Sequence, residues 1–340
     1  MPLIMRPAAR DWTCEPAPDE VRAFHADLPG HTPTPLTELP ALAVELGVAR
    51  VFVKDESARL GLPAFKALGA SWAIHRILAA AGGPLTLVTA TDGNHGRAVA
   101  RTARLLNQRA HVLVPQGVGP GAVDAIAAEG ARVTRVEGPY DEAVRRAAEV
   151  ADAPGAVLVQ DTAWPGYEEI PGWIVEGYST LFAEIDSQLA ATGSELPDLV
   201  AVPAGVGSLA QAAVTHYRSR RTHGPCLLSV EPEAASCVLA SLTHGRPMSV
   251  TTGDTIMAGL NCGTPSSLAW PFLRDGLDAA VAVTDADSAR AVHDLAALRV
   301  FSGPSGAASL AGIRSAVAQG LALEPGSTVV LLSTEGPTAA

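Results

Sequence analysis

Short, mostly apolar runs rich in β-branched residues alternate with longer Ala-rich stretches through most of the chain. The apolar runs are typical of strands buried in a parallel sheet, and the Ala-rich stretches are typical of helices that cover its faces. The strands are predicted at residues 85–89, 110–114, 132–136, 199–202, 227–230, 280–283 and 329–332. The helices are predicted near residues 94–107, 120–129, 140–151, 207–219, 284–298 and 304–318. This alternation favours βα units and mostly parallel sheets.

The predicted strands form two series, and a long helical stretch from about 167 to 191 lies between them. We therefore expect an α/β fold with two doubly wound domains and a cleft between them. The larger domain is expected to combine residues 1–70 and 190–340, and the smaller one to span residues 71–189.

Composition narrows the possible partners and the location. The chain has 340 residues, of which 48% are hydrophobic and 17% charged, as in a globular enzyme. Its net charge of −11 argues against nucleic acid and anionic membranes as partners. No apolar run is long enough to span a bilayer, and the N-terminal residues lack the apolar core of a signal peptide. We expect a cytoplasmic protein that binds no membrane.

The four cysteines show no metal-binding spacing, so the sequence predicts no zinc or other metal site. They are Cys14, Cys226, Cys237 and Cys262. Buried free thiols are the expected state, although Cys237 and Cys262 could be neighbours in the fold.

Lysine is almost absent, and the two lysines of the chain, Lys54 and Lys66, lie close together in the sequence. Unlike arginine, lysine can lose its proton and form a Schiff base. Lys66 precedes a run of small and apolar residues, where desolvation is expected to lower its pKa and favour the neutral amine. Lys54 is expected to be structural, paired with Asp55, Glu56 or another neighbouring acid.

A glycine-rich loop follows the strand predicted at 199–202 and opens a helix. Gly205 and Gly207 let the backbone approach an anion, Ser208 adds a hydroxyl, and the helix N-terminus attracts negative charge, so a bound phosphate is predicted. The same residues also fit a dinucleotide fingerprint, with Glu231 as the acid that binds a ribose. A nicotinamide dehydrogenase is therefore an alternative, and it gives Lys66 no role.

Residues 91–96 form a second polar turn between a predicted strand and a predicted helix. Asn94 could hydrogen-bond a ring oxygen of a cofactor, and Asp92 could act as an acid or a base. Either residue could instead serve only as a helix N-cap or as part of an Asx turn.

These segments resemble the fold-type II pyridoxal-phosphate enzymes, which include threonine dehydratases, cysteine synthases and tryptophan synthase β. Within that family the pattern is most similar to the diaminopropionate ammonia-lyases. The resemblance covers nearly the whole chain in order, through residues 24–30, 34–36, 54–57, 65–70, 91–96, 160–167, 170–178, 203–208 and 333–336.

The resemblance implies a tryptophan synthase β-like fold, with pyridoxal 5'-phosphate bound by the larger domain. It makes Lys66 the lysine that binds the cofactor covalently, with Phe65 packed beside it and Asn94 on the cofactor's phenolic oxygen. Ser333 or Thr334 would face the pyridine nitrogen. The phosphate would lie on Gly205, Val206, Gly207, Ser208 and Leu209.

Two aspartates bear on the substrate. Threonine dehydratases usually have a serine at the start of the 91–94 motif and no aspartate at its second position, so Asp92 is a discriminating residue, and we interpret it as a catalytic base. Asp161 could pair with the β-ammonium group of 2,3-diaminopropionate, or it could be a turn residue after a strand at 156–160. Pro63 and Phe301 depart from the family pattern near the site.

The function implied is the α,β-elimination of 2,3-diaminopropionate, in its D or L form or both, to pyruvate and ammonia. Elimination or β-replacement on a serine- or threonine-like amino acid is an alternative within the family, and a ligand-binding homologue without activity is a third hypothesis. The partner is a small amino-acid substrate, and a homodimer is expected.

Overall fold

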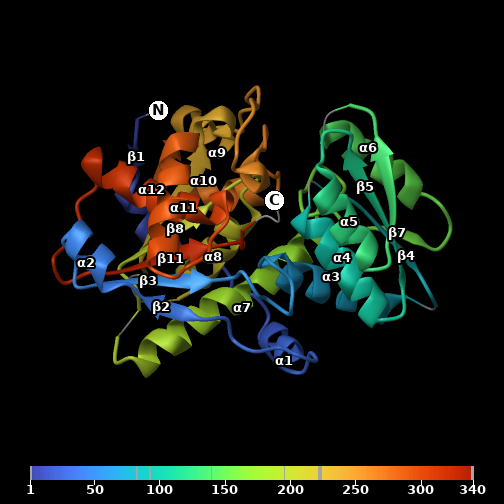
Figure 1. The fold of residues 1–340 in the computed structure, drawn as a ribbon, viewed down its shortest axis with the longest axis horizontal. Coiled ribbons are helices and arrows are strands. Elements are labelled where there is room, and N and C mark those ends of the chain that lie inside the picture. Colours follow the sequence, from blue (N-terminus) through green and yellow to red (C-terminus); the bar gives the residue numbers. More distant parts are fainter. Residues whose placement is uncertain are drawn as a thin grey trace.

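The computed structural model describes residues 2–81, 83–91, 93–138, 140–194, 196–220 and 224–337. Two sheets stand side by side, and helices cover both (Figure 1). The larger sheet has the strand order β1-β10-β9-β8-β11-β3-β2, with β1 and β2 antiparallel to their neighbours and the other pairs parallel. The smaller sheet has the order β6-β5-β4-β7 and is parallel throughout.

The strands of the larger sheet come from both ends of the chain, and those of the smaller sheet come from one continuous stretch. The larger sheet contains β1 (Ile4–Met5), β2 (Leu36–Glu38), β3 (Arg50–Asp55), β8 (Leu199–Pro203), β9 (Cys226–Pro232), β10 (Ala279–Val283) and β11 (Thr328–Ser333). The smaller sheet contains β4 (Thr86–Ala90), β5 (Arg109–Pro115), β6 (Arg132–Val136) and β7 (Ala156–Leu158).

Helices precede, connect and flank these strands. The α-helices are α1 (Glu20–Ala26), α2 (Pro40–Leu46), α3 (Lys66–Ala80), α4 (Asn94–Leu105), α5 (Pro120–Ala128), α6 (Tyr140–Ala151), α7 (Glu169–Ala191), α8 (Ser208–Arg218), α9 (Cys237–His244), α10 (Ala269–Gly276), α11 (Asp285–Ala297) and α12 (Pro304–Ala318). The described residues also form the short 3₁₀ helices η1 (Pro7–Asp11), η2 (Glu233–Ala235) and η3 (Ala258–Leu260). None of the helices in the described part of the chain is long and apolar enough to cross a membrane.

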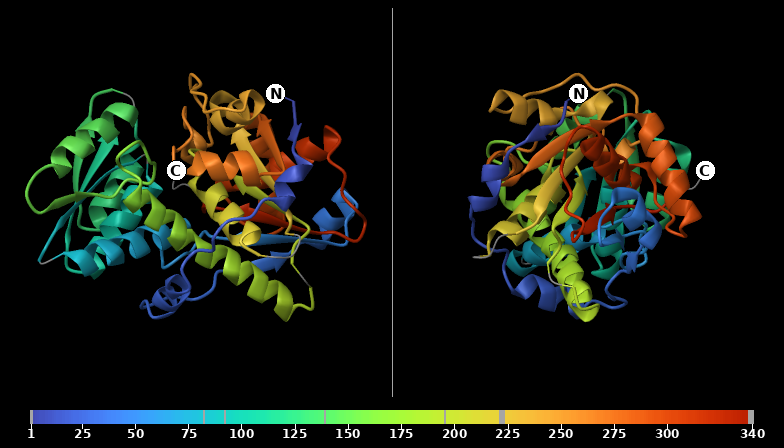
Figure 2. Two further views of the ribbon diagram at one scale, coloured as in Figure 1. Left: turned by 180° about the vertical axis from the view of Figure 1, so that it is seen from behind. Right: turned by 90° about the vertical axis from the view of Figure 1, so that its left-hand side faces the viewer.

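Helix α7 connects the two sheets. Seen from behind, it runs obliquely from the smaller sheet to a position beneath the larger one (Figure 2). It packs against α3 and α8, and its crossing with α3 is unusually close. A Cβ on Gly177 would lie 2.6 Å from the carbonyl oxygen of Leu68, and a Cβ on Gly69 would lie 2.6 Å from the Tyr178 ring. Glycine at both positions therefore allows the backbone contact that fixes α3, and with it Lys66, against α7.

Each strand and helix predicted from the alternating pattern is present, with ends that differ by a few residues. The pattern did not predict β3, because Arg50, Lys54 and Asp55 interrupt its apolar run. The side chain of Lys54 is nevertheless fully buried, through partners that lie far away in the sequence. The domain limits 1–70 with 190–340, and 71–189, remain a proposal that agrees with the membership of the two sheets.

Candidate active site

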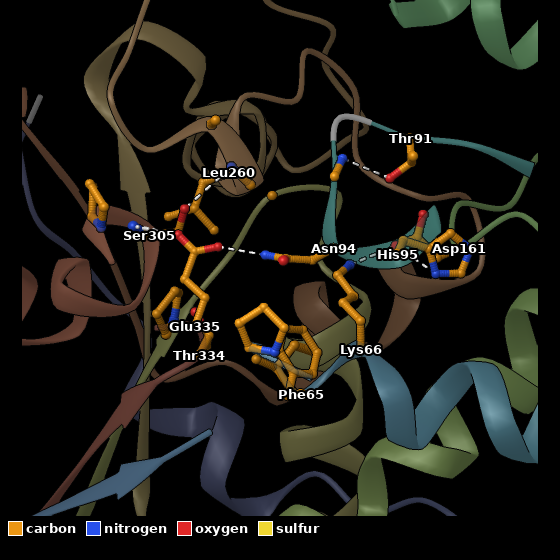
Figure 3. Close-up of a pocket in the computed structure, with 18 of the residues that line it drawn as sticks. Phe65, Lys66, Thr91, Asn94, His95, Asp161, Leu260, Ser305, Thr334 and Glu335 are labelled. Carbon is orange, nitrogen blue, oxygen red and sulfur yellow. Dashed lines mark hydrogen bonds and ion pairs between the residues drawn. The ribbon is translucent and has the colours of Figure 1, made fainter. Parts of the chain in front are cut away.

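A cavity of about 350 Å³ lies between the two sheets. Its walls include segments that follow parallel strands of both sheets, among them β4 and β7 of the smaller sheet, and β3, β8 and β11 of the larger one. Ligands of open α/β sheets bind outside the carboxyl ends of the strands, so the position is the expected one. The close-up in Figure 3 shows Asn94 and Glu335 pointing toward one another, and Lys66 pointing toward Asp161.

Lys66 is the first residue of α3 and donates a hydrogen bond of 2.6 Å from Nζ to Oδ2 of Asp161. Asp161 follows β7, so the ion pair joins α3 to the smaller sheet. The ring centroid of Phe65 lies 5.2 Å from the Lys66 ammonium, and the ring packs on Tyr178 of α7. The structure thus brings three of the predicted residues, Lys66, Phe65 and Asp161, into one cluster.

The expected pKa of Lys66 was wrong in sign. Burial, the largest single effect, lowers the pKa of this amine, but the surrounding groups, first of all the Asp161 carboxylate, together raise the pKa above its usual value. The prediction considered only the apolar residues that follow Lys66 and could not include a carboxylate that the fold brings in from another strand. The lysine is therefore an ammonium, and the ion pair also holds the pKa of Asp161 well below its usual value against the effect of burial.

The glycine-rich loop lies between β8 and α8, and all five residues predicted to hold a phosphate line the cavity: Gly205, Val206, Gly207, Ser208 and Leu209. Gly207 has φ +97°, and a Cβ there would lie 2.5 Å from the Leu273 side chain. Only glycine fits this position. The first turn of α8 leaves backbone N–H groups without partners inside the helix, so the loop offers donors and a positive dipole end to an anion.

Asn94 is the first residue of α4 and reaches across the cavity to a residue that the sequence analysis did not assign. Its Nδ2 donates a hydrogen bond of 2.7 Å to Oε2 of Glu335, which follows β11. Oε1 of Glu335 accepts a bond of 3.2 Å from the backbone N–H of Ser305 near the start of α12. Burial raises the pKa of Glu335. The position of Glu335 just after the predicted strand at 329–332 could have indicated from the sequence that this residue lies at the cleft.

Ser333 and Thr334 were alternatives for the same role, and the structure separates them. Thr334 lines the cavity (Figure 3). Ser333 is fully buried beneath it and donates a hydrogen bond of 2.8 Å to the hydroxyl of Ser302. Of the two, Thr334 has the position from which a side chain can reach a ligand. The role of Asp92 cannot be placed, because this residue lies outside the described residues.

His95 follows Asn94 and lies beside Asp161, almost completely buried. Its Nε2 is 2.8 Å from the carbonyl oxygen of Val159. Its Nδ1 is 3.8 Å from Oδ2 of Asp161, the same oxygen that accepts from Lys66 (Figure 3).

Glu231, which the dehydrogenase hypothesis needs for a ribose, does not face the cavity. Its carboxylate accepts hydrogen bonds of 2.8 and 2.7 Å from the backbone N–H groups of Val238 and Leu239, at the start of α9. Burial raises its pKa to about 8. Glu231 therefore stabilises a helix terminus, and the dinucleotide fingerprint loses its acidic residue.

Lys54 takes no part in the cavity. Its buried ammonium donates to Glu184 of α7 at 2.7 Å, to the Thr34 carbonyl oxygen at 2.7 Å and to Gln188 at 2.8 Å. The structural role expected of Lys54 agrees with this geometry, but its partner is Glu184 rather than Asp55 or Glu56. The four cysteines all lie in the described part of the chain, and none of them forms a disulfide.

The donor set of the cavity suits pyridoxal phosphate. The glycine-rich loop and the α8 terminus can receive the phosphate, Lys66 supplies an amine, Phe65 supplies an apolar wall, and Asn94 supplies an amide donor. The Gly207 position also requires a residue without a side chain, as a cradle for an anion does.

Comparison with known proteins decides the family. A model of the pyridoxal-phosphate dependent enzymes matches residues 28–335. The chain belongs to this family. It is 39% identical to diaminopropionate ammonia-lyase of Salmonella typhimurium, over 94% of this chain and 89% of that protein.

The fold gives the same result. The structure of diaminopropionate ammonia lyase from Escherichia coli with an aminoacrylate-PLP azomethine reaction intermediate superposes with a TM-score of 0.90. The structure of that enzyme with D-serine superposes with a TM-score of 0.89. Both are 34% identical and cover 99% of this chain and 94% of the solved one. The family has the tryptophan synthase β-like fold and uses pyridoxal phosphate, so the predicted fold and cofactor are confirmed, and the nicotinamide dehydrogenase is excluded.

Proposed function

We propose that the protein is a lyase that converts 2,3-diaminopropionate and water to pyruvate and two molecules of ammonia. The observation that carries the substrate assignment is the Asp161 carboxylate, which lies in the cavity beside Lys66 and already binds a cation there. A β-ammonium group is a cation of the same kind. The similarity to diaminopropionate ammonia-lyases over nearly the whole chain supports the assignment.

Pyridoxal phosphate, when bound, withdraws electrons from the α-carbon of an amino acid and so acidifies the Cα proton. The residues of this chain do the rest. Lys66 would hold the cofactor covalently, and its amine, when it is not bound to the cofactor, would be placed to accept the Cα proton from one face. Asp161 holds the β-amine in its protonated form, so that the leaving group departs as neutral ammonia. Loss of this ammonia leaves 2-aminoacrylate, which reacts with water to give pyruvate and the second ammonia.

The other predicted residues have positioning roles in this proposal. The loop from Gly205 to Leu209 binds the phosphate, Asn94 donates to the phenolic oxygen, and Thr334 is the residue of its pair that faces the pyridine nitrogen. Asp92 is proposed as the base for the enantiomer whose Cα proton points away from Lys66.

The test is pyruvate release from a panel of D- and L-2,3-diaminopropionate, D- and L-serine and L-threonine. We expect kcat/KM for one or both forms of diaminopropionate to exceed that for serine by about tenfold or more, since a charge-assisted bond contributes roughly 1.5–3 kcal/mol. Asp92→Asn should remove the activity on the D form and spare much of that on the L form. Preference for serine or threonine would instead identify a dehydratase. Binding without pyruvate release from any member would indicate a ligand-binding homologue.

We also propose that the chain forms a homodimer in the cytoplasm, as expected from the family. Light scattering should then give a molar mass of about twice the 34.8 kDa of one chain. A monomeric mass would contradict the dimer and leave the assignment of the reaction unchanged.

A further inference from the structure

The imidazole of His95 has one nitrogen with a fixed role and one without a partner. A carbonyl oxygen can only accept, so the contact of 2.8 Å with Val159 requires a proton on Nε2. Nδ1 is buried and has no hydrogen-bond partner among the described residues. Buried polar atoms in native proteins are rarely left without a partner, and those that are often lie at functional sites. This nitrogen faces Asp161 at 3.8 Å.

The ion pair beside it is complete only while Lys66 is an ammonium. Oδ2 of Asp161 accepts from Lys66 at 2.6 Å and has His95 as its other neighbour. The proposed function takes the Lys66 amine away from this carboxylate, because the amine joins the cofactor. A buried carboxylate that loses its only cation is strongly destabilised unless another donor replaces it.

The groups around the pair leave few candidates for that donor. Tyr178 of α7 lies near Lys66, and burial raises the pKa of its phenol, so it remains neutral. A neutral phenol can donate a hydrogen bond, but it cannot replace the charge of the ammonium. The Tyr167 hydroxyl is already committed, since it donates to the Leu158 carbonyl oxygen and accepts from the Gln160 backbone N–H. Ser208 donates to the backbone carbonyl of Asp161, not to its carboxylate. His95 Nδ1 needs a shift of about 1 Å to reach hydrogen-bond distance.

We propose that His95 is a positioning residue for Asp161. Once Lys66 is joined to the cofactor, His95 Nδ1 holds a proton and donates a hydrogen bond to Oδ2 of Asp161. The carboxylate then stays ionised and oriented toward the β-ammonium group of the substrate. The consequence for substrate affinity rests on the proposed function, whereas the protonation of His95 does not.

The two charges beside His95 act on its pKa in opposite directions, and the proposal depends on removing one of them. Burial lowers its pKa, the Asp161 carboxylate raises it, and the Lys66 ammonium lowers it. Removal of the Lys66 charge takes away a contribution that lowers the pKa and leaves the one that raises it. The pKa of His95 should therefore rise when Lys66 is neutralised, whether by the cofactor or by substitution.

Two substitutions distinguish the roles of the two nitrogens of His95. His95→Gln places its amide nitrogen where Nε2 lies, so it keeps the bond to Val159 but has no polar atom at the position of Nδ1. His95→Asn places a polar atom where Nδ1 lies and loses the bond to Val159. If His95 positions Asp161, the glutamine variant should raise KM for diaminopropionate by about tenfold or more, while the asparagine variant changes it by about threefold or less. Cofactor content and KM for serine should change little in either.

The reverse order of the two variants would overturn the proposal, because it would mean that His95 only anchors the Val159 carbonyl. Equal effects on diaminopropionate and serine would overturn it as well. An unfolded glutamine variant would leave the second measurement to decide.

The second measurement needs no turnover. Histidine NMR titration of the cofactor-free protein gives the pKa of His95, with the missing signal of His95→Gln as its assignment. We expect a higher pKa in Lys66→Met than in the wild type, and a higher pKa in the wild type after pyridoxal phosphate is added. An unchanged or lower pKa in both would overturn the proposal. If the wild type fails to release pyruvate from diaminopropionate, the proposed function is wrong and this titration still decides the role of His95.

Discussion

The two lysines of the chain occupy opposite kinds of site. Lys54 is completely buried, and its three hydrogen bonds leave its ammonium no free donor. Lys66 is partly exposed to a cavity, and its ammonium donates a hydrogen bond to the Asp161 carboxylate. Burial lowers the pKa of Lys54 in spite of its acidic neighbours, whereas Asp161 raises the pKa of Lys66 in spite of burial. A buried lysine whose three N–H groups all donate to protein acceptors stabilises the fold. A lysine at a cavity that is held by one carboxylate can exchange that partner for a ligand.

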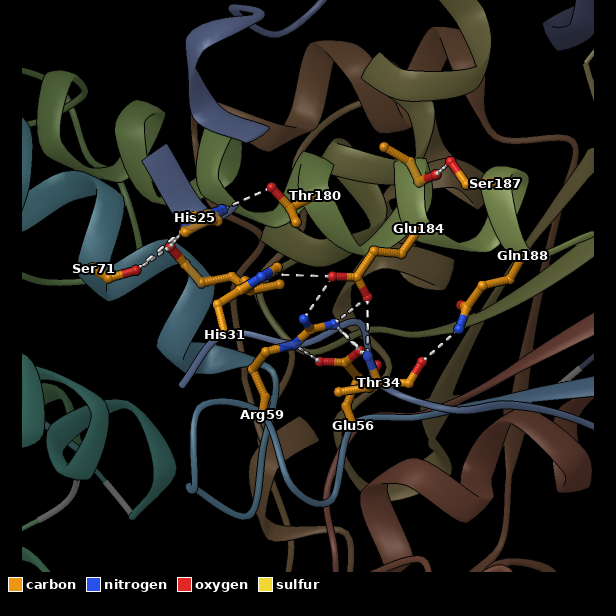
Figure 4. A network of polar contacts seen from close by, with 12 residues as sticks. His25, His31, Thr34, Glu56, Arg59, Ser71, Thr180, Glu184, Ser187 and Gln188 are labelled. Atoms are coloured by element: carbon orange, nitrogen blue, oxygen red, sulfur yellow. Dashed lines mark hydrogen bonds and ion pairs between the residues drawn. The ribbon is translucent and has the colours of Figure 1, made fainter. Parts of the chain in front are cut away.

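Lys54 belongs to a network of buried charges in which each charged group has partners; Figure 4 shows this network around Arg59 and Glu184. Arg59 is also fully buried and binds Glu56 at 2.7 Å and Glu184 at 2.7 Å. Two cations thus face two carboxylates, and the hydroxyl of Thr34 donates to Glu56 at 2.6 Å. The network ties β3 and the segment around Thr34 to α7. It holds in place the helix against which α3, with Lys66, is packed.

Replacing each lysine with methionine should give the largest difference between the two sites, one in activity and the other in stability. Lys66→Met removes the amine that holds the cofactor and accepts a proton, so kcat should fall by about 10²–10⁴-fold or more, while the melting temperature changes little. Lys54→Met should lower the melting temperature and leave the activity of the folded fraction near that of the wild type. Borohydride reduction followed by peptide mapping should find the cofactor on residue 66 in the wild type and in Lys54→Met. A cofactor found on Lys54 would reverse the assignment of the two sites.

The features that depend on a local pattern of residues, namely strands and turns, could be predicted from the sequence. β8 and β11 were predicted because the ranges 199–202 and 329–332 contain only apolar residues. The loop from Gly205 to Leu209 was predicted from its glycines and the helix that follows. β3 was missed because its lysine looks exposed until Glu184 of α7 is brought to it.

The error in the pKa of Lys66 has the same cause as the missed strand. Asp161 is distant along the chain, and no spacing rule connects it to Lys66. Glu335 was overlooked in the same way, since its contact with Asn94 forms only when the two sheets face each other. Charge partners across a fold are set by topology, and local pattern does not contain them.

A charge removed from the buried network should weaken folding more than the same change at the surface. Glu184→Gln keeps the shape of the side chain but leaves Lys54 and Arg59 with the Glu56 carboxylate alone. Removal of one partner from a buried ion pair costs about 3–5 kcal/mol, so the free energy of unfolding should fall by that amount. Glu142→Gln, which removes one of the two carboxylate partners of Arg145 on the exposed face of α6, is the matched control and should change little. Urea unfolding of both variants measures the difference, and equal losses would mean that the network is not a source of stability.

The smallest expected effect is at the carboxylate that pairs with Lys66. Asp161→Asn leaves the Lys66 ammonium without its ion pair, but this ammonium borders a cavity that water can enter, so the free energy of unfolding should change far less than in Glu184→Gln. The effect should appear in substrate recognition. A β-ammonium group loses a charge-assisted bond worth roughly 1.5–3 kcal/mol, so KM for diaminopropionate should rise about tenfold or more. A β-hydroxyl can bond to the amide almost as well as to the carboxylate, so KM for serine should change little. Steady-state kinetics with both substrates provide the measurement. Equal losses on both would show that Asp161 supports the cavity instead of selecting the substrate, and the contrast between the two lysines would then rest on Lys66 alone.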